Sequence, residues 1–347
     1  MKLTIQTPGA LTTIQDLGRW GYQAIGMPVS GAMDAPALVR GNILLDNPDN
    51  AAGLEVTMSG PSILFGDGDG AIAITGGDLQ PKLNGQSVPN WTVIAVHAGD
   101  MLTFGGICGK GFRSYICVSG GIDVPTVMGS RSTYIKAKIG GLDGRKLQKG
   151  DELTTGIAGK YNAGVSCPEN LRPDYSNAPL RTVLGPQDSY IKPEGIKTFF
   201  EAEYKLSSSS DRMGSRMEGG KIIEHVKGPD IVSDAIPMGA VQIPGQGLPI
   251  VMMADRQTTG GYVKIGVVHA LDVARLSQYM PGDPVRFTEI TQEQGINISR
   301  AEAEMLNALR AHVSQPVQTI QTTDRQHGAM NIIVDGEKFF VEWEKLS

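Results

Sequence analysis

The sequence predicts a mainly β protein with a few short helices, and three observations lead to this class. The chain of 347 residues contains 45 Gly and 20 Pro, so turns must be frequent and long helices few. Residues 1–6 alternate between apolar and polar side chains, as a half-buried strand does. Apolar residues make up 40% of the chain, which is enough to build a sizeable core.

The first half of the chain reads as a series of short strands with one helix. Strands are expected at residues 3–7, 52–58, 61–65, 71–75, 91–96, 101–105, 112–118 and 151–155. Asp34 is expected to cap a helix that has Pro36 near its first turn and ends near residues 46–48. Residues 12–34 show no clean period and contain several glycines, which indicates a long, ordered, irregular segment of the kind that lines a site.

The second half restarts after a proline-containing stretch without periodicity. We therefore expect an N-terminal domain at 1–160, a linker at 161–179, a C-terminal domain at 180–314 and a tail with a β-hairpin at 315–347. Residues 98–104 and 281–287 resemble one another, which fits either an internal duplication or recurring turn chemistry.

Two helices and one terminal hairpin are expected in the second half. One helix covers residues 271–279. The other covers 299–313, where Ser299 and Glu302 match a capping box ahead of an apolar stripe. In the tail, residues 331–334 and 338–341 flank Asp335-Gly336, a strong hairpin signal.

Composition excludes several classes of protein. The net charge is −5 and no basic block occurs, so we expect no nucleic-acid partner and no adsorption to anionic lipid. No apolar run approaches membrane-spanning length, and the N-terminus lacks a signal peptide's apolar core. Three scattered cysteines suit free thiols in a reducing compartment. These features favour a cytoplasmic location.

Several familiar site motifs are missing from the sequence. There is no P-loop, no dinucleotide fingerprint followed by a helix, and no serine nucleophile elbow. The five histidines are isolated and no Cys-x-x-Cys occurs, so we expect no metal site built by this chain. Asn331 follows Met330 where a biotin carrier has a modifiable lysine, so we expect no biotin attached to this chain.

Residues 255–262 carry more polar chemistry than a turn requires. Two apolar runs, 249–254 and 263–268, flank this stretch, and Gly260-Gly261 alone would suffice for a tight hairpin between them. The remaining side chains form a rim of donors and acceptors on rigid strands, which is where binding chemistry tends to lie. The alternative is a polar loop that closes a barrel.

Polar residues recur beside glycines in three further places, around residues 15–34, 113–123 and 210–216. Arginine forks bind carboxylate or phosphate in bidentate fashion, and carboxylates can hold Mg²⁺ or move protons. We therefore expect one site for a small anionic molecule, although each Arg–Asp coincidence taken singly fits a structural salt bridge. The candidate catalytic residues are Asp16, Arg19, Asp255 and Arg256. The candidate substrate- or anion-binding residues are Gln15, Ser30, Asp34, Arg113, Ser119, Gly120, Arg212, Arg216, Gln242, Gln257, Thr258, Thr259, Gly260, Gly261 and Tyr262.

Taken together, these segments resemble one protein family. The matching stretches are residues 12–22, 30–34, 113–115, 119–122, 140–145, 210–214, 239–244 and 255–262. They resemble the KipA-type family, also called allophanate hydrolase subunit 2 or the biotin-dependent carboxyltransferase-like family, which includes the 5-oxoprolinase C subunits. The resemblance implies two cyclophilin-like β-barrel domains in tandem.

The resemblance also implies an activity carried out in a complex. The expected function is that of one component of an ATP-dependent 5-oxoprolinase, an amide (lactam) hydrolase that opens 5-oxoproline to glutamate. The implied partners are a KipI-type subunit and a LamB/YcsF-type subunit, and ATP with Mg²⁺ is expected to act with them. One alternative is a biotin-dependent carboxyltransferase acting on urea or a small amide. Another is a non-enzymatic antagonist that binds a KipI-type kinase inhibitor.

The chain departs from the family pattern at two positions. Ser215 stands where the family usually has an aromatic residue, and Val263 stands where it usually has proline. Both departures put the shape of the substrate site in doubt.

Overall fold

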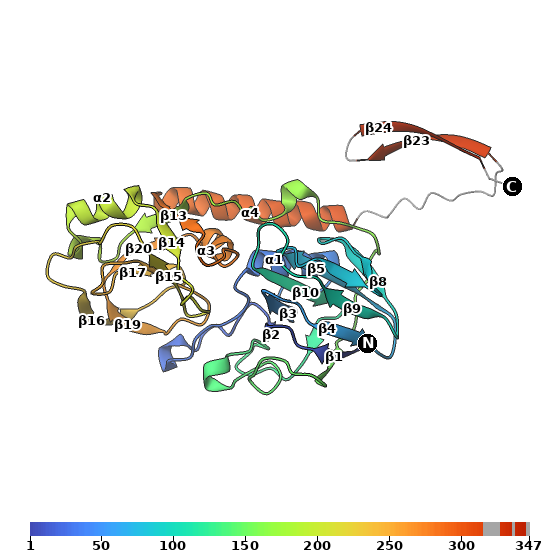
Figure 1. Cartoon of the computed structure of the whole chain (residues 1–347), viewed down its shortest axis with the longest axis horizontal. Coiled ribbons are helices and arrows are strands. Elements are labelled where there is room, and N and C mark those ends of the chain that lie inside the picture. The colour runs from blue at the N-terminus through green and yellow to red at the C-terminus, as the bar shows by residue number, and fades with distance from the viewer. Residues whose placement is uncertain (315–326, 335–336, 345–347) are drawn as a thin grey trace. The chain divides into compact units, whose positions relative to one another are not determined.

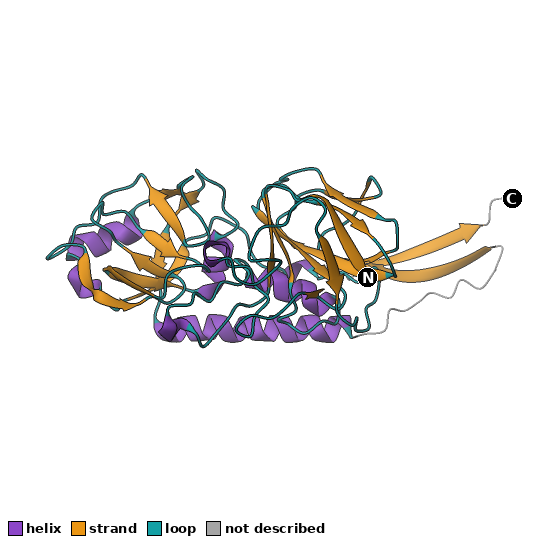
Figure 2. Ribbon diagram, turned by 90° about the horizontal axis from the view of Figure 1, so that it is seen from below, coloured by secondary structure: helices purple, strands orange, loops and turns teal. Residues whose placement is uncertain are grey.

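β-strands dominate the structure, as the sequence predicts (Figures 1 and 2). The computed structural model describes residues 1–314, 327–334 and 337–344, with side chains for the first of these ranges. Residues Met1–Ser314 form one compact unit and Gln315–Ser347 form a second.

Residues before 156 build two sheets. Their strand orders are β11-β12-β1-β4-β9-β6-β7 and β2-β3-β10-β5-β8. The strands are β1 (Lys2–Thr7), β2 (Leu11–Gln15), β3 (Gly53–Thr57), β4 (Ser62–Phe65), β5 (Gly70–Gly76), β6 (Pro81–Leu83), β7 (Gln86–Ser87), β8 (Val93–Val96), β9 (Met101–Phe104), β10 (Arg113–Val118), β11 (Ile122–Asp123) and β12 (Glu152–Thr155). Every residue of β5 and of β10 is buried, as expected for inner strands.

The strands predicted in this half are all present, but β2, β6, β7 and β11 are not among the predicted strands, and β2 is the longest of these four. It lies inside the segment predicted to be irregular and pairs with β3 along its whole length, from Leu11 opposite Thr57 to Gln15 opposite Gly53. Its β-branched residues suit a strand, but the polar residues and glycines that follow obscure the pattern.

Helix α1 (Ala35–Leu44) begins where the sequence predicts. The Asp34 carboxylate accepts a hydrogen bond from the backbone N–H of Ala37 at 3.1 Å, so Asp34 is the N-cap. The helix packs against β5 and β10 at short range. A Cβ on Gly41 would lie 2.5 Å from the Cys117 sulfur, so only glycine permits this approach.

Residues 180–289 form a third sheet with the order β21-β14-β15-β18-β17-β20-β13-β22. Its strands are β13 (Leu180–Leu184), β14 (Tyr204–Leu206), β15 (Gly214–Glu218), β17 (Ala240–Gln242), β18 (Ile250–Met252), β20 (Lys264–Val268), β21 (Pro284–Val285) and β22 (Phe287–Glu289). A separate ribbon pairs β16 (Asp230–Ala235) with β19 (Thr259–Tyr262). The sheets of the two halves are the two sets of strands on either side of Figure 1.

The simple hairpin suggested for residues 249–268 is therefore wrong. β18 and β20 do not pair with each other, because β17 lies between them and pairs with both. The glycines that suggested a turn belong to β19, whose backbone groups find their partners on β16.

Helices α2 (Pro193–Glu201), α3 (Ala270–Leu276) and α4 (Gln292–Val313) complete this half. The prediction that α4 starts at Ser299 is wrong. Thr291 and Gln294 form the capping box instead, so the helix begins earlier than predicted. With 22 residues, α4 is longer than the short helices that the sequence predicts for this half. Glu302, which was assigned to the cap, pairs with Arg40 through two hydrogen bonds of 2.6 and 3.0 Å.

Helix α4 joins the two halves of the compact unit. Near its N-terminus the carbonyl oxygen of Gly295 lies 3.1 Å from His269, at the start of α3. Near its C-terminus, Leu309 and Val313 are buried in a core cluster with residues of α1. Figures 1 and 2 both show α4 running alongside the two sets of strands.

The second unit contains an antiparallel ribbon of β23 (His327–Val334) and β24 (Glu337–Glu344). The predicted turn at Asp335-Gly336 and residues 315–326 lie outside the described residues. Among the helices of the described ranges, none has the length and apolar character needed to cross a bilayer. The three cysteines are free thiols.

Candidate functional site

Arg256 is a buried cation in the middle of the 255–262 stretch. Its side chain is 6% exposed. Its Nε donates to the carbonyl of Ile236 at 3.0 Å and its Nη1 to the carbonyl of Met253 at 3.3 Å. Within residues 1–314 it forms no salt bridge with a carboxylate. Burial lowers the pKa of Arg256 to about 10, so the guanidinium is still protonated at neutral pH.

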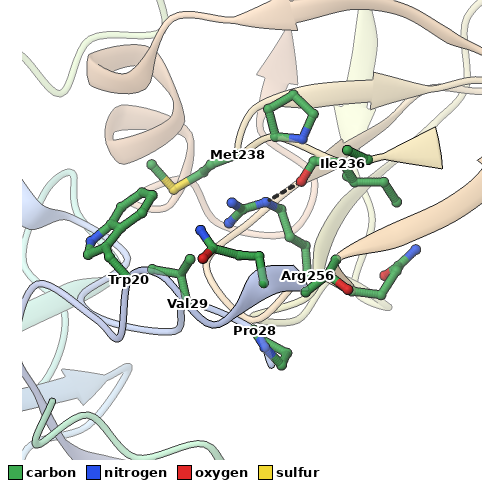
Figure 3. Close-up of a pocket in the computed structure, with 11 residues that line it drawn as sticks. Trp20, Pro28, Val29, Ile236, Met238 and Arg256 are labelled. Carbon is green, nitrogen blue, oxygen red and sulfur yellow. Dashed lines mark hydrogen bonds between the residues drawn. The ribbon is translucent and has the colours of Figure 1, made fainter. Parts of the chain in front are cut away.

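Arg256 faces a cavity of about 640 Å³, here called the Arg256 cavity. This volume lies in the range of pockets that hold small molecules. One wall comes from the loop after β2, one from the segment after β16, and the floor from the 255–262 stretch. The lining residues are Trp20, Gln23, Pro28, Val29, Ala235, Ile236, Pro237, Met238, Arg256, Gln257 and Thr258. Figure 3 shows the guanidinium pointing into the space between Trp20, Val29 and Met238.

Asp255, the neighbour of Arg256, is held by Arg212. The Arg212 Nε and Nη2 donate to the two oxygens of Asp255 at 2.9 and 3.0 Å, and its Nη1 donates to Glu55 at 2.5 Å. All three side chains are buried. Burial opposes the charge of Arg212, but Asp255 and Glu55 outweigh it and raise the pKa of Arg212 above its ordinary value. Asp255 is therefore part of a fixed ion network and Arg256 is not.

The Arg212 network and a backbone hydrogen bond beside it fix the floor of the Arg256 cavity relative to the wall that follows β2. Arg212 Nη2 also donates to the carbonyl of Gly31 at 2.7 Å, and the N–H of Ser30 donates to the carbonyl of Ala254 at 3.1 Å. Val29 and Arg256 lie within two residues of these anchors along the chain.

Asp16 serves as an acceptor for the loop that follows residue 129. Its carboxylate accepts hydrogen bonds from the Gly18 N–H at 2.8 Å, the Ser130 hydroxyl at 2.6 Å, the Arg131 N–H at 2.6 Å and the Ser132 hydroxyl. This arrangement suits a carboxylate that positions a loop.

Arg19 is fully buried and incompletely paired. Its Nη2 donates to the carbonyl of Ser132, whereas Nε and Nη1 have no partner within residues 1–314. Burial lowers the pKa of Arg19, against the opposing charges of Asp16 and Asp255. Arg19 does not line the Arg256 cavity.

The structure separates the other predicted charged residues into different places. Asp34 lines a cavity of about 520 Å³ beside α1 and α3. Its carboxylate accepts from Tyr175 and Gln278, each at 2.7 Å, and burial raises the pKa of Asp34. Arg113 lines a smaller cavity of about 110 Å³. The structure therefore does not bring Asp34 and Arg113 into the Arg256 cavity.

The remaining candidates are also spread out. Gln257 and Thr258 line the Arg256 cavity. Thr259, Gly260, Gly261 and Tyr262 form β19. The Ser119 hydroxyl accepts from the N–H of Ala71 and the Gly120 N–H donates to Asn47, and neither Ser119 nor Gly120 lines the Arg256 cavity. Arg216 is exposed on β15. Gln15, Ser30 and Gln242 are buried, and each has a side-chain atom without a partner within residues 1–314.

Sequence reasoning missed the apolar walls and one carboxylate. Trp20, Pro28, Val29, Ile236 and Met238 line the Arg256 cavity, but apolar residues carry no signal that separates a pocket wall from a core. Glu55 was detectable in principle, because it is the one charged residue in the apolar strand β3.

The lining of the Arg256 cavity fits a small monoanion better than a nucleotide. It offers one guanidinium, and its other residues are neutral. Within the described residues, no group of three His, Cys, Asp or Glu side chains gathers to hold a metal ion. ATP with Mg²⁺ brings a triphosphate and a divalent cation, which need several cations and carboxylates. The Arg256 cavity, with one guanidinium and no carboxylate in its lining, does not offer them.

Comparisons with known proteins place the chain in a family. Residues 25–289 match the family model described as "Carboxyltransferase domain, subdomain A and B". The chain is 36% identical to the 5-oxoprolinase C subunit of Escherichia coli over 294 residues, covering 85% of this chain and 93% of that protein. It is 36% identical over 309 residues to the 5-oxoprolinase C subunit of Haemophilus influenzae, covering 87% and 96%.

A solved structure gives the same result for the fold. The crystal structure of the K. lactis urea amidolyase matches with a TM-score of 0.83 and 28% identity, covering 89% of this chain. This chain spans only 20% of that much longer protein.

These matches confirm the family resemblance found in the sequence motifs. The family model covers the motif segments from residue 30 to residue 262, including the 255–262 stretch and the residues around Arg212. The chain belongs to the family of carboxyltransferase domains, subdomains A and B.

Proposed function

We propose that this chain is a subunit of an ATP-dependent 5-oxoprolinase that opens 5-oxoproline to glutamate. The observation that carries the proposal is the buried Arg256 guanidinium, which has no carboxylate partner within residues 1–314 and faces a cavity of about 640 Å³. Such a cavity suits a small anion. The similarity to two 5-oxoprolinase C subunits, over more than nine-tenths of their own length, supports 5-oxoproline as that anion.

The substrate suits the chemistry of the cavity. 5-Oxoproline is a compact five-membered lactam that bears one carboxylate. Arg256 binds the carboxylate, and the ring lies against Val29, Ile236 and Met238. Gln257 and Thr258 supply polar groups for the lactam amide. The residues of this chain thus bind and orient the substrate and exclude water from its apolar face.

Partner subunits supply what this chain lacks. ATP contributes the phosphoryl group that activates the lactam oxygen, after which water adds to the ring carbon, the C–N bond breaks and phosphate leaves. We propose that the KipI-type and LamB/YcsF-type subunits bind ATP and Mg²⁺, since within the described residues of this chain no group of three His, Cys, Asp or Glu side chains gathers to hold a metal ion. The hydrolase is accordingly active only as a complex. The proposed reaction uses no biotin attached to this chain.

Reconstitution tests the proposal directly. The chain is purified with a KipI-type and a LamB/YcsF-type subunit from the same organism, and glutamate release from 5-oxoproline is measured with and without ATP. We expect ATP-dependent release by the complex of all three proteins and none by this chain alone. Absence of release by an assembled complex would overturn the proposal.

Replacing Arg256 tests the role of the cavity. Arg256→Gln removes a charge-assisted hydrogen bond worth about 1.5–3 kcal/mol, so kcat/KM for 5-oxoproline is expected to fall about 10- to 100-fold, chiefly through KM. Arg256→Lys keeps the positive charge, so we expect a smaller fall in kcat/KM. Arg216→Gln, at an exposed arginine on β15, is the matched control and keeps its KM. An unchanged KM in a folded Arg256→Gln complex would rule out carboxylate binding by this residue.

A second candidate is carboxyl transfer to urea or a small amide. The observation in its favour is the TM-score of 0.83 to the K. lactis urea amidolyase. Addition of carboxylated biotin carrier and urea to the same complex distinguishes the two reactions. Carboxylation of urea without glutamate release from 5-oxoproline would favour this second candidate.

A further inference from the structure

The Arg113 side chain lies in a cavity of its own, apart from the Arg256 cavity. Arg113 is the first residue of β10 and is 9% exposed. Its Nη1 donates to the carbonyl of Ser277, which follows α3. Its Nε has no hydrogen-bond partner within residues 1–314. A guanidinium that is removed from water and incompletely paired is costly unless an acceptor reaches it.

The cavity beside Arg113 has a volume of about 110 Å³ and is here called the Arg113 cavity. A water molecule needs roughly 10–15 Å³ on this measure, so the space accommodates an ion of several oxygen atoms. The cavity shares no lining residue with the Arg256 cavity.

Serine hydroxyls line the Arg113 cavity together with the arginine. Four serines of the segment between β14 and β15 and of β15 itself line it, and Ser207 and Ser215 among them are buried. They belong to the second half of the chain, whereas Arg113 belongs to the first. The four are Ser207, Ser208, Ser210 and Ser215.

The acidic groups nearby are already engaged. Glu55 acts on Arg113 through its charge, but its carboxylate accepts from Arg212 at 2.5 Å and from the Tyr115 hydroxyl at 2.7 Å. Asp211 lies at the rim and accepts from the N–H groups of Met213 and Gly214 at 2.8 and 3.2 Å. Burial lowers the pKa of Arg113, with Glu55 opposing, so an added anion would favour the protonated guanidinium.

We propose that Arg113 and the serines at 207–215 form a second anion site, which binds a small inorganic oxyanion of phosphate size. The ion accepts hydrogen bonds from the Arg113 guanidinium and from serine hydroxyls. Because its ligands come from both halves of the chain, it stabilises the contact between them. The proposal is independent of the 5-oxoprolinase reaction.

Titration of the full chain with inorganic phosphate tests the site. Thermal unfolding is followed in phosphate and in sodium chloride of equal ionic strength, and affinity is measured by calorimetry. We expect phosphate, and not chloride, to raise the Tm. Arg113→Gln lowers the phosphate affinity at least tenfold, whereas Arg256→Gln, in the other cavity, retains it.

A second variant and a crystallographic experiment test the site even if the Arg113→Gln protein does not fold. Ser215→Leu places a larger apolar side chain in the cavity lining without changing Arg113, and we expect the same loss of phosphate binding. In crystals grown with selenate, the anomalous selenium signal is expected beside Arg113. The same titration with bicarbonate shows which of the two oxyanions the site prefers. A larger rise in Tm with bicarbonate than with phosphate identifies bicarbonate as the bound oxyanion.

Three results would overturn the proposal. One is a Tm that responds equally to chloride and to both oxyanions. Another is unchanged oxyanion affinity in both folded variants. The third is selenate bound only beside Arg256 or on the surface, away from Arg113.

Discussion

At the scale of single residues, three of the buried arginines, Arg212, Arg256 and Arg113, have different surroundings. Arg212 has two carboxylate partners, Asp255 and Glu55. Arg256 has only carbonyl partners within residues 1–314. Arg113 has a carbonyl partner and an unpaired Nε there. The pKa of the first is raised and that of the other two lowered, because carboxylates offset burial only at Arg212. Paired arginines stabilise structure, and unpaired ones can bind anions.

This difference predicts a large stability cost for loss of Arg212. Arg212→Met leaves two carboxylates buried without their cation, so the free energy of unfolding is expected to fall by about 3–5 kcal/mol. Urea denaturation measures the change. The control is Arg286→Met, which removes an exposed pair with Glu203 at 3.5 Å and costs less than about 1 kcal/mol. Equal effects of the two substitutions would contradict the structural role of Arg212.

At the scale of elements, His269 links α3 to α4. Its Nδ1 accepts from the N–H of Leu271 at the start of α3, at 3.3 Å. Its Nε2 lies 3.1 Å from the Gly295 carbonyl and 3.0 Å from the Ser299 hydroxyl in α4. An Nδ1 that accepts a hydrogen bond must be unprotonated, so this cap requires the neutral ring. Burial and the charge of Arg181 lower the pKa of His269.

The lowered pKa gives the stability a definite pH dependence. The unfolded chain takes up a proton near the ordinary histidine pKa of about 6.5, while the folded chain resists it. The stability contributed by His269 is therefore present above that pH and is lost as the pH falls towards its folded pKa, with a slope of at most about 1.4 kcal/mol per pH unit. His269→Asn retains a capping group without a titrating ring, so its urea midpoint should fall less between pH 7 and pH 5. A variant with the same pH dependence as the wild type would contradict this assignment.

At the scale of the whole molecule, α4 and the Arg212 network hold the two halves of Met1–Ser314 in one compact unit. The sheets form from separate sequence segments. The contacts between the halves include the partly buried pair of Arg40 and Glu302 and the hydrogen bond from Arg212 to Gly31. The domain boundaries expected at 160, 179 and 314 stay predictions.

These contacts predict cooperative unfolding of the two halves. Leu309→Ala opens a cavity where α4 packs on α1 and is expected to cost about 2–5 kcal/mol. Amide hydrogen exchange in the full chain should show this loss both in β5 of the first half and in β20 of the second. Loss confined to β5 would show that the halves unfold independently.

Local sequence features were enough to predict the class of fold and the position of several elements. Gly and Pro content with short apolar runs predicted a mainly β protein, and Asp34 with Pro36 predicted the start of α1. Such signals act over a few residues, so one sequence contains them completely. They failed where two local signals competed, as for the capping box of α4, where Thr291 with Gln294 forms the cap and Ser299 with Glu302 does not.

The site itself depended on contacts between residues far apart in the chain. The motifs were sufficient to recognise the family and to show that the 255–262 stretch is rich in polar groups. Only the folded structure shows that Asp255 forms an ion pair with Arg212 while Arg256 faces a cavity. It also shows that Asp34 and Arg113 line two other cavities. The reason is physical: a buried charge takes its role from its partners, and the partners of these residues lie on other strands and loops.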